Sequence, residues 1–544
     1  MTFTAATLAE ALRDCVEKWP ERRLAFPELD RELTVRQLAW NAERFAAELL
    51  RAGVGTGDVV GLLSATGPQV LTGVLAATCA GAAVSLLPIP PMMRDLESAA
   101  RHVTGFVDSA EMRYLLVDAS QAELGDLVRA ARPGTTVLRL PTDEVPAGGP
   151  TPGLPDVSPD DIAIVQYTSG STAQPKGVVL RHRTVAAGLR SIGVAADITP
   201  DDVFIQWVPH FHDMGLFGWL AYLTHGATTH TFSPGGFIRR PARFLEYFAA
   251  HRGTVTCGPD FGYNLMIQSM DDKAVAELDL SSWRFAFNGS EPVSAATVTA
   301  FMERLKPAGV RPETMFPVYG MAEATLAVTF PEPGEAPRIL HVDRTLLAGE
   351  EEVRLVDAAD PEAKPVVAVG RPVEGLELRL RTRSGEPAAD GQLAEIQIRG
   401  QGVTEGYYRS PGATEALFDG GWLKTGDLGF RHQDRLYVAG RIKDMVIVKG
   451  KNFFAQDVEA VVCDLPGIYR GRCVAVPDDA EHLTVVAETK QAHQELAEEI
   501  RLRVAAELGL SAIRVHLVRP GRLPRTTSGK WRRNEVRQLV ASAT

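Results

Sequence analysis

The sequence has few cysteines, and none of them are spaced as a metal-binding or redox pair. The 544-residue chain has five, and no Cys-x-x-Cys pair occurs among Cys15, Cys79, Cys257, Cys463 and Cys473. An odd number without such a pair predicts neither a disulfide framework nor a zinc site. We therefore expect a reducing, cytoplasmic environment.

Basic residues are also fewer than acidic ones. The chain has 57 Lys and Arg residues against 68 Asp and Glu residues, which gives a formal net charge of −11. Proteins that bind nucleic acids normally present a basic surface. The balance therefore argues against a nucleic-acid partner, but it leaves room for a locally basic site that binds an anionic ligand.

Charge is absent altogether from residues 59–93, a stretch long enough to span a membrane. Glycines and prolines interrupt it, among them Gly67, Pro68 and a proline cluster that starts at Pro88. A strand (VVGLLSA), a helix (QVLTGVLAATCAGA) and a second strand (AVSLLPI) explain it better, as a buried βαβ unit. The first residues also lack the basic and apolar regions of a signal peptide. We expect neither a membrane span nor a leader.

The length predicts two or more domains, and the patterns change along the chain. Helical and strand patterns alternate in the first part, which predicts an α/β architecture with largely parallel sheets. Later segments such as LELRLRT, AEIQIRG and RLYVAGR alternate apolar and polar residues, which is typical of a small antiparallel, barrel-like sheet. A last unit of about 100 residues, the size of a small domain, begins near Ile442.

Residues 167–178, YTSGSTAQPKGV, indicate a phosphate site, because glycine and hydroxyl residues lead up to a single lysine, Lys176. The common P-loop pattern fails here, since Pro175 precedes the lysine and Gly177 follows it. Backbone N–H groups and hydroxyls of the segment could still surround a polyphosphate. Taken alone, a glycine- and serine-rich surface turn explains the segment as well.

The same segment resembles the signature of the adenylate-forming superfamily, which contains acyl-CoA synthetases, peptide-synthetase adenylation domains, luciferases and fatty acyl-AMP ligases. The resemblance recurs in order along most of the chain. The matching segments are WVPHFHDMGL (207–216), FNGSEPV (287–293), PVYGMAEATL (317–326), GWLKTGDLG (421–429), GRIKDMVIVKGKNFFAQDVE (440–459) and LPRTTSGKWRR (523–533).

The resemblance implies an α/β fold in two domains. Residues 1–440 would form a large N-terminal AMP-binding domain of two layered α/β subdomains plus a small β-barrel, with an insertion-like segment at about 338–370. Residues 441–544 would form a small, mobile C-terminal α+β domain, with Lys443 at its hinge.

The resemblance also implies a role for individual residues. Lys530 would bridge the substrate carboxylate and the α-phosphate, His212 would lie near the carboxylate, and Glu323 would be both catalytic and the ligand of Mg²⁺. The residues expected to contact ATP or AMP are Thr168, Ser169, Gly170, Ser171, Thr172, Lys176, Asn288, Gly289, Ser290, Glu291, Tyr319, Gly320, Met321, Asp427 and Arg441.

Each assignment has an ordinary alternative when the residue is read by itself. A glutamate such as Glu323 is most often a solvated helix residue, and an aspartate beside glycine, such as Asp427, is usually a turn residue. His212 could be a structural histidine. The basic stretch around Lys530 reads as an exposed loop that could bind any anion. We assign no role to His210.

Within the superfamily, three segments resemble the fatty acyl-AMP ligases most: FHDMGLFGWL, LDLSSWRFAFNGSEPV and YGMAEATLAV. The extra segment at 338–370 lies where those ligases carry an insertion that is thought to hinder CoA transfer. The implied reaction uses ATP and Mg²⁺ to convert a carboxylic acid, such as a fatty acid, into an acyl-adenylate. The acyl group then passes to the phosphopantetheine thiol of a separate acyl carrier protein, because the chain shows no carrier motif of its own.

Three alternatives stay open: a CoA ligase, a ligase that passes the adenylate to an amine, and a degenerate binding module without activity. Retention of Glu323, Asp427 and Lys530 disfavours the last. The paired glycines Gly235 and Gly236 depart from the resemblance, and they leave the chain length of the acid open.

Overall fold

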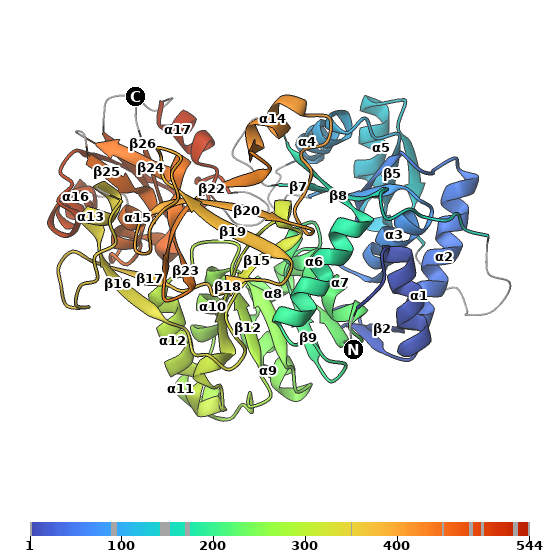
Figure 1. Ribbon diagram of the computed structural model, residues 1–544, viewed down its shortest axis with the longest axis horizontal. Coiled ribbons are helices and arrows are strands. Elements are labelled where there is room, and N and C mark those ends of the chain that lie inside the picture. The colour runs from blue at the N-terminus through green and yellow to red at the C-terminus, as the bar shows by residue number, and fades with distance from the viewer. Residues whose placement is uncertain are drawn as a thin grey trace.

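The structure is a computed structural model, and it describes residues 3–88, 95–141, 153–168, 175–349, 351–448, 451–477, 482–490, 494–525 and 531–541. Two large, mainly parallel sheets with helices packed on them occupy one side of the molecule, and smaller sheets occupy the other (Figure 1). The predicted α/β class with a smaller antiparallel part is confirmed.

The first large sheet has six strands, and its neighbouring strands are parallel except for the last pair. Its strands, in spatial order, are β6 (Thr136–Arg139), β5 (Tyr114–Val117), β3 (Val59–Leu63), β4 (Ala83–Leu86), β7 (Ile162–Tyr167) and β8 (Gly177–Arg181). The helices that follow its strands are α3 (Pro68–Cys79), α4 (Leu96–Ser109) and α5 (Ala122–Ala131).

The uncharged stretch is the centre of this sheet. It forms β3, α3 and β4, and nearly all of its described side chains are buried, which explains why it carries no charge. No helix in the described part of the chain is long and apolar enough to cross a membrane. The predicted βαβ unit is therefore confirmed.

The second large sheet has seven strands, and its edge comes from a distant part of the chain. The strands, in spatial order, are β13 (Met315–Pro317), β12 (Phe285–Asn288), β11 (Val255–Gly258), β9 (Val203–Gln206), β10 (Thr228–Thr231), β1 (Arg23–Phe26) and β2 (Arg31–Thr34). All neighbours are parallel except β1 and β2, which form an antiparallel pair beside β10.

Helices cover this sheet and link it to the first one (Figure 1). Helix α7 is apolar all round and fully buried, with Trp219 donating its indole N–H to Thr229 at 3.3 Å. The helices of this region are α1 (Leu8–Lys18), α2 (Val35–Arg51), α6 (His182–Ala195), α7 (Asp213–Thr224), α8 (Pro234–Arg239), α9 (Pro241–Ala250), α10 (Asp260–Ile267), α11 (Asp272–Ala276) and α12 (Ala295–Leu305).

Antiparallel strands follow, as the alternating patterns predict. The described pairings run in one open path through β19 (Leu376–Arg381), β20 (Ala394–Gly400), β22 (Trp422–His432) and β21 (Phe418–Asp419), with β23 (Arg435–Arg441) beside β22 and helix α14 (Pro411–Leu417) between β20 and β21 in sequence. A smaller sheet joins β14 (Tyr319–Met321), β15 (Leu326–Phe330) and β18 (Arg371–Pro372).

Residues 445–541, here called the C-terminal unit, pack around hydrophobic clusters of their own, in which Val458, Val485 and Ile500 are fully buried. The strands are β24 (Met445–Val448), β25 (Lys451–Phe454), β26 (Cys473–Pro477), β27 (Leu483–Glu488) and β28 (Ile513–Val518); the helices are α15 (Ala455–Cys463), α16 (Gln494–Leu508) and α17 (Arg533–Ala541). The domain boundary after residue 440 stays a prediction.

The insertion-like segment lies against the C-terminal unit. It forms β16 (Ile339–Asp343), α13 (Arg344–Gly349) and β17 (Ala363–Val367). The buried ammonium of Lys364 lies 2.8 Å from Asp457 and 4.2 Å from the centre of the Phe454 ring. Arg344 donates to the Glu507 carbonyl oxygen at 2.9 Å. These contacts join the segment to α15, β25 and α16.

The amino-terminal end of the seven-stranded sheet depends on one buried carboxylate. Asp202, 1% exposed, lies 2.7 Å from Arg284 and accepts the Thr254 hydroxyl at 2.7 Å. We expect Asp202→Ala to lower the free energy of unfolding by about 2 to 3 kcal/mol, because Arg284 and Thr254 lose their acceptor.

Urea unfolding followed by circular dichroism measures this effect. The matched control is Asp201→Ala, since Asp201 is exposed on the neighbouring position. The control should change stability by less than about 0.5 kcal/mol. Equal unfolding midpoints for the two variants would contradict the importance of the Asp202 contacts.

Candidate active site

The predicted phosphate segment lies in sequence between the paired ends of β7 and β8, where Tyr167 pairs with Gly177. Thr168 donates its backbone N–H to the Lys176 carbonyl oxygen at 3.2 Å. Ser169, Gly170, Ser171 and Thr172 lie outside the described residues. Lys176 is half-buried, and its ammonium lies 5.1 Å from the centre of the Tyr407 ring.

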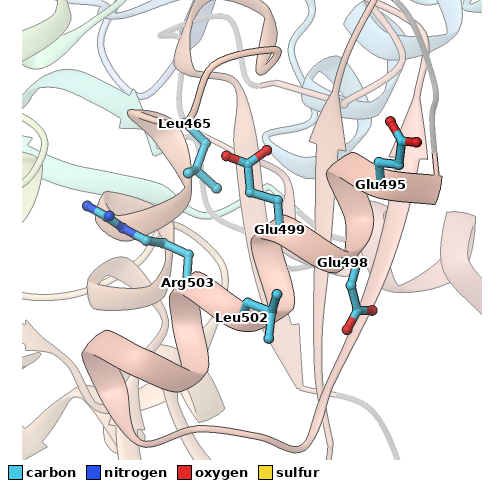
Figure 2. A pocket seen from close by; sticks show the side chains of 6 residues that line it. All are labelled: Leu465, Glu495, Glu498, Glu499, Leu502 and Arg503. Atoms are coloured by element: carbon cyan, nitrogen blue, oxygen red, sulfur yellow. The ribbon is translucent and has the colours of Figure 1, made fainter.

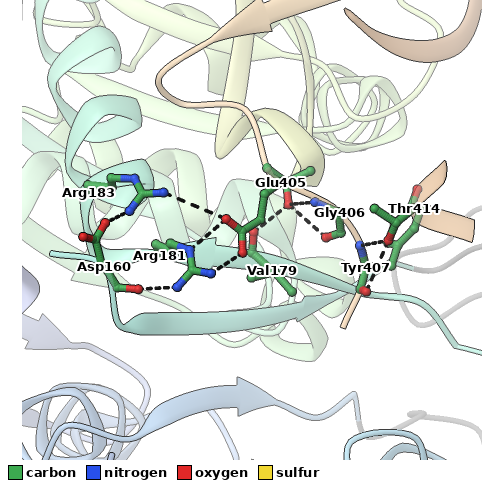
Figure 3. A network of polar contacts seen from close by, with 9 residues as sticks. Asp160, Val179, Arg181, Arg183, Glu405, Gly406, Tyr407 and Thr414 are labelled. Atoms are coloured by element: carbon green, nitrogen blue, oxygen red, sulfur yellow. Dashed lines mark hydrogen bonds and ion pairs between the residues drawn. The ribbon is translucent and has the colours of Figure 1, made fainter. Parts of the chain in front are cut away.

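Residues 405–408, which lie between β20 and α14, run beside β8, and their contacts fix the position of Tyr407. Val179 donates its backbone N–H to Gly406 O at 3.0 Å, and Arg181 donates to the Glu405 carboxylate at 2.8 Å (Figure 3). The Tyr407 N–H is donated to Thr414 Oγ1 at 3.0 Å. These contacts hold the ring against the lysine with little freedom.

Tyr407 also contacts the predicted catalytic glutamate. Glu323 lies between β14 and β15, is buried, and accepts the Tyr407 hydroxyl at 2.8 Å. Burial raises the pKa of Glu323, and the hydrogen bond from Tyr407 partly offsets that rise. The next turn is strained, because Thr325 and Leu326 have φ of 49° and 90°. Lys176, Tyr407 and Glu323 thus form one continuous polar contact, which we call the Tyr407 bridge.

The predicted ribose-binding residues form a second contact. Asp427, on β22, accepts the Tyr319 hydroxyl at 2.6 Å and the Arg441 Nε–H at 2.7 Å. Asp427 and Arg441 are also paired in the register of β22 and β23. Asp427 raises the pKa of Arg441, and burial followed by Asp427 raises that of Tyr319. Three motifs that are far apart in sequence therefore meet here.

The Asp427 contact and the Tyr407 bridge lie near each other. Burial raises the pKa of both Glu323 and Tyr407; Asp213 adds to the rise for Glu323, and the positive charge of Arg441 partly offsets the rise for both. Asp213 opens α7, and its Oδ1 lies 2.6 Å from His212 Nδ1 and accepts the Met214 N–H at 2.7 Å. The structure therefore brings His212 to the neighbourhood of Glu323.

Asn288, the last residue of β12, connects the predicted adenine segment to the sheet. Its side-chain N–H is donated to Asp260 at 3.0 Å, while its Oδ1 is buried without a partner among the described residues. Asp260 also accepts the Thr297 hydroxyl at 2.6 Å, and burial raises its pKa. An unpaired amide oxygen at this position is available to a ligand N–H group.

Backbone crowding explains the glycines of this region. A side chain at Gly289 would lie 2.9 Å from the Val318 carbonyl oxygen, and one at Gly320 would overlap that of Leu326. Ser290 has a φ of 67°. Glu291 accepts the Phe261 N–H at 2.7 Å. Met321 ends β14, the strand that also holds Tyr319 and Gly320.

Lys530 lies outside the described residues, but the positions on both sides of it are described. Arg525 lies 3.7 Å over the Trp531 ring and pairs with it as an isolated β-bridge. Burial lowers the pKa of Arg525 to about 10, whereas the charge of Glu291 raises it. The flanks of the Lys530 segment are therefore close to the predicted adenine segment.

The predicted hinge residue Lys443 is exposed, and His210, to which the sequence analysis assigns no role, is neutral. Lys443 is exposed in the turn Ile442–Asp444 between β23 and β24. His210 is fully buried, and burial lowers its pKa to about 4, which makes it neutral at pH 7. Its Nε2 has no partner among the described residues.

Sequence motifs did not single out Tyr407 or Asp260. Both are recognised only through their partners, Glu323 and Lys176 for the first and Asn288 for the second. The described residues contain no cluster of three or more His, Cys, Asp or Glu side chains that could hold a metal. A divalent cation at Glu323 would take most of its ligands from phosphate and water.

Comparison with known proteins identifies the family. The model of the AMP-binding enzyme family matches residues 12–408, which is most of the chain. The chain belongs to the AMP-binding enzyme family. The Lys176, Glu323 and Asp427 segments described above lie inside or directly after the matched range, and the C-terminal unit lies beyond it.

Individual relatives agree with this assignment. The chain is 36% identical to a medium-chain-fatty-acid–[acyl-carrier-protein] ligase of Teredinibacter turnerae, over 71% of the chain and 64% of that protein. It is 30% identical to a long-chain-fatty-acid–AMP ligase of Mycobacterium marinum, over 98% and 97%. A structure from a study of fatty acyl-adenylate ligases of E. coli and L. pneumophila superposes with a TM-score of 0.92, at 29% identity, over 100% of this chain and 99% of the other.

The Asp427 contact predicts an effect on nucleotide affinity. Asp427→Asn keeps the shape of the side chain but removes the charge that Arg441 and a ribose hydroxyl would use. We expect AMP to bind about 10- to 100-fold more weakly, as measured by calorimetry, because a hydrogen bond to a charged group is lost. Asp434→Asn, at an exposed position in the neighbouring turn, is the control. Unchanged AMP affinity in the Asp427 variant would contradict the ribose assignment.

Proposed function

We propose that this enzyme uses ATP to activate a fatty acid as an acyl-adenylate and then transfers the acyl group to an acyl carrier protein. The observation that carries the proposal is that residues of three separate motifs meet: Lys176 and Glu323 both contact Tyr407, and Asp427 contacts Arg441, whose charge acts on Glu323. The names of the fatty-acid and acyl-carrier-protein ligases among the relatives support the substrate and the acceptor.

The first half-reaction joins two anions. A carboxylate oxygen of the acid attacks the α-phosphorus of ATP, the bond to the bridging oxygen breaks, and pyrophosphate leaves. We assign the leaving phosphates to Lys176 and the segment from Thr168 to Thr172, the adenine to the segment from Asn288 to Glu291 with Tyr319, Gly320 and Met321, and the ribose to Asp427 and Arg441. Lys530 would neutralise charge on the reacting carboxylate and α-phosphate.

Glu323 is the residue that fits Mg²⁺. Its carboxylate is buried but hydrogen-bonded through one oxygen, and a hard cation prefers such oxygens together with those of phosphate. Bound there, Mg²⁺ supplies positive charge that offsets the repulsion between the phosphates and the incoming acid. The role of Tyr407 is to hold the carboxylate in place.

In the second half-reaction a thiol attacks the acyl carbonyl carbon and AMP leaves. We propose that residues 441–544 form a separate domain that moves about Lys443 between the two half-reactions, taking Lys530 out of the site. The contacts of Lys364 with Asp457 and of Arg344 with Glu507 oppose large rotations of that domain. They favour a carrier protein over CoA as the acceptor, since the insertion-like segment would limit the rearrangement.

The proposal is tested by supplying Mg²⁺, ATP and a panel of carboxylic acids, followed in parallel by CoA, a holo carrier protein or an amine. We expect pyrophosphate release with fatty acids, loaded carrier and no acyl-CoA. Lys530→Ala should reduce pyrophosphate release at least about 100-fold while ATP still binds, because charge stabilisation in the transition state is lost. Arg537→Ala, an exposed arginine on α17, is the control.

Two results would contradict the proposal. Fast acyl-CoA formation would make the protein a CoA ligase, and nucleotide binding without pyrophosphate release for any acid would indicate a binding module. Unchanged adenylation by the Lys530 variant would refute the role of that lysine.

The Tyr407 bridge yields a separate prediction. Tyr407→Phe removes the hydroxyl donated to Glu323 but keeps the ring beside Lys176. We expect the Mg²⁺ concentration needed for half-maximal pyrophosphate release to rise about tenfold, since loss of a residue that orients a metal ligand typically costs 10- to 100-fold. Tyr408→Phe, on the next residue, is the control. An unchanged Mg²⁺ requirement with reduced stability would show that Tyr407 is only structural.

A further inference from the structure

One end of the sheet in the C-terminal unit gathers positive charge. Strand β26 is antiparallel to β27, and β27 is parallel to β28, so the start of β26 lies beside the ends of the other two. Basic residues occupy all three chain segments at this end: Arg470, Arg472, Lys490, Arg519 and Arg522. We call these five residues the basic end.

The cations of the basic end are close together. Arg470, Arg472 and Lys490 all lie 5.4 to 5.5 Å from the centre of the Tyr469 ring. Thr489 donates its backbone N–H to Val518 O at 2.9 Å, which sets Lys490 beside the segment that starts at Arg519. Like charges gathered around one ring repel each other unless an anion is present.

Little negative charge in the described part of the chain compensates them. Glu488 is 1% exposed and accepts from Arg472 at 3.2 Å, and its other oxygen accepts the N–H groups of Gly521 and Leu523. Arg470, Lys490, Arg519 and Arg522 are exposed, and none of them pairs with a described carboxylate. In a chain of net charge −11, four unpaired cations on one surface indicate an anionic partner.

The basic end contacts the segment that precedes Lys530, because Glu488 accepts from both Arg472 and the Leu523 N–H. Burial lowers the pKa of Arg525 in that segment, the charge of Arg472 lowers it further, and the charge of Glu291 in the predicted adenine segment raises it. Acidic residues are more frequent on α16, where Glu495, Glu498 and Glu499 line an open hollow of about 600 Å³ together with Arg503 (Figure 2). The C-terminal unit is therefore electrically asymmetric, with cations around the ends of its strands and carboxylates along α16.

We propose that the basic end is the docking surface for an acidic acyl carrier protein, and this inference rests on the proposed function. The cations spread over three chain segments around the ends of strands spaced about 4.8 Å apart, which is wider than one phosphate group and suits a protein surface. A carrier also presents the anionic phosphodiester of its phosphopantetheine arm. Complementary charge of this kind mainly accelerates association.

The test replaces Arg470, Arg519 and Arg522 together by Gln. Arg472 is kept because it anchors Glu488. The matched control replaces three exposed arginines of the large part of the chain, Arg13, Arg51 and Arg243, by Gln, which changes the net charge equally. Acceptors are a holo acyl carrier protein of net negative charge, CoA, and uncharged pantetheine, each added to full-length enzyme with ATP, Mg²⁺ and the acid.

We expect kcat/KM for the carrier to fall about tenfold or more at low ionic strength and its salt dependence to flatten, because steering by charge is lost. Pyrophosphate release and transfer to pantetheine should stay unchanged, and so should every rate of the control variant. Selective loss of carrier transfer with these unchanged rates supports a docking surface.

Other outcomes overturn the inference. Normal carrier loading by the triple variant refutes the docking surface and leaves the proposed function untouched. A loss confined to CoA, or an equal loss in ATP-dependent pyrophosphate release, assigns the cations to a small anionic ligand instead. Failure of the unaltered enzyme to release pyrophosphate refutes the proposed function, and the docking surface with it.

Discussion

The whole site depends on a hydrogen-bond donor for one buried carboxylate. Glu323 lies in a short turn between two strands, where water has little access, and its hydrogen bond comes from Tyr407, 84 residues later. For that hydroxyl to reach it, the segment around Tyr407 must run along β8, which it does through backbone hydrogen bonds with Val179 and Gly177. The antiparallel part of the chain is thereby held against the first large sheet, directly beside the phosphate segment.

The second contact likewise supplies donors to a buried carboxylate, and here one of the donors is a cation. Asp427 is buried, and Arg441 and Tyr319 satisfy its two oxygens from different strands. Arg441 also acts at a distance on Glu323, so the two carboxylates of the site share one cation. An anionic ligand between Glu323 and Asp427 would also meet the cations Arg441 and Lys176. A chain of net negative charge can therefore still hold a nucleotide.

Much of this arrangement follows from the sequence, and the remainder depends on contacts between distant residues. The uncharged run with its glycine and proline interruptions predicts β3, α3 and β4, whose side chains are buried on nearly all sides. Such local patterns cannot predict that β1 pairs with β10, some 200 residues away, since strand partners leave no local mark. Motifs locate Glu323 and Asp427, yet not Tyr407, whose importance lies entirely in its neighbours. Lys364 is likewise an ordinary lysine in sequence, and only the fold reveals its buried pairing with Asp457.

The distribution of charge connects the two proposed half-reactions. Lys176 and Arg441 belong to the part of the chain that holds the nucleotide, whereas the basic end and Lys530 belong to the C-terminal unit. If a carrier protein binds the basic end, it binds the part of the chain that also contains Lys530, the lysine proposed for adenylation. A movement of that part of the chain would then displace Lys530 and the bound carrier together. The insertion-like segment, bonded to α15 and α16 on another side of that unit, limits how far such a movement can go.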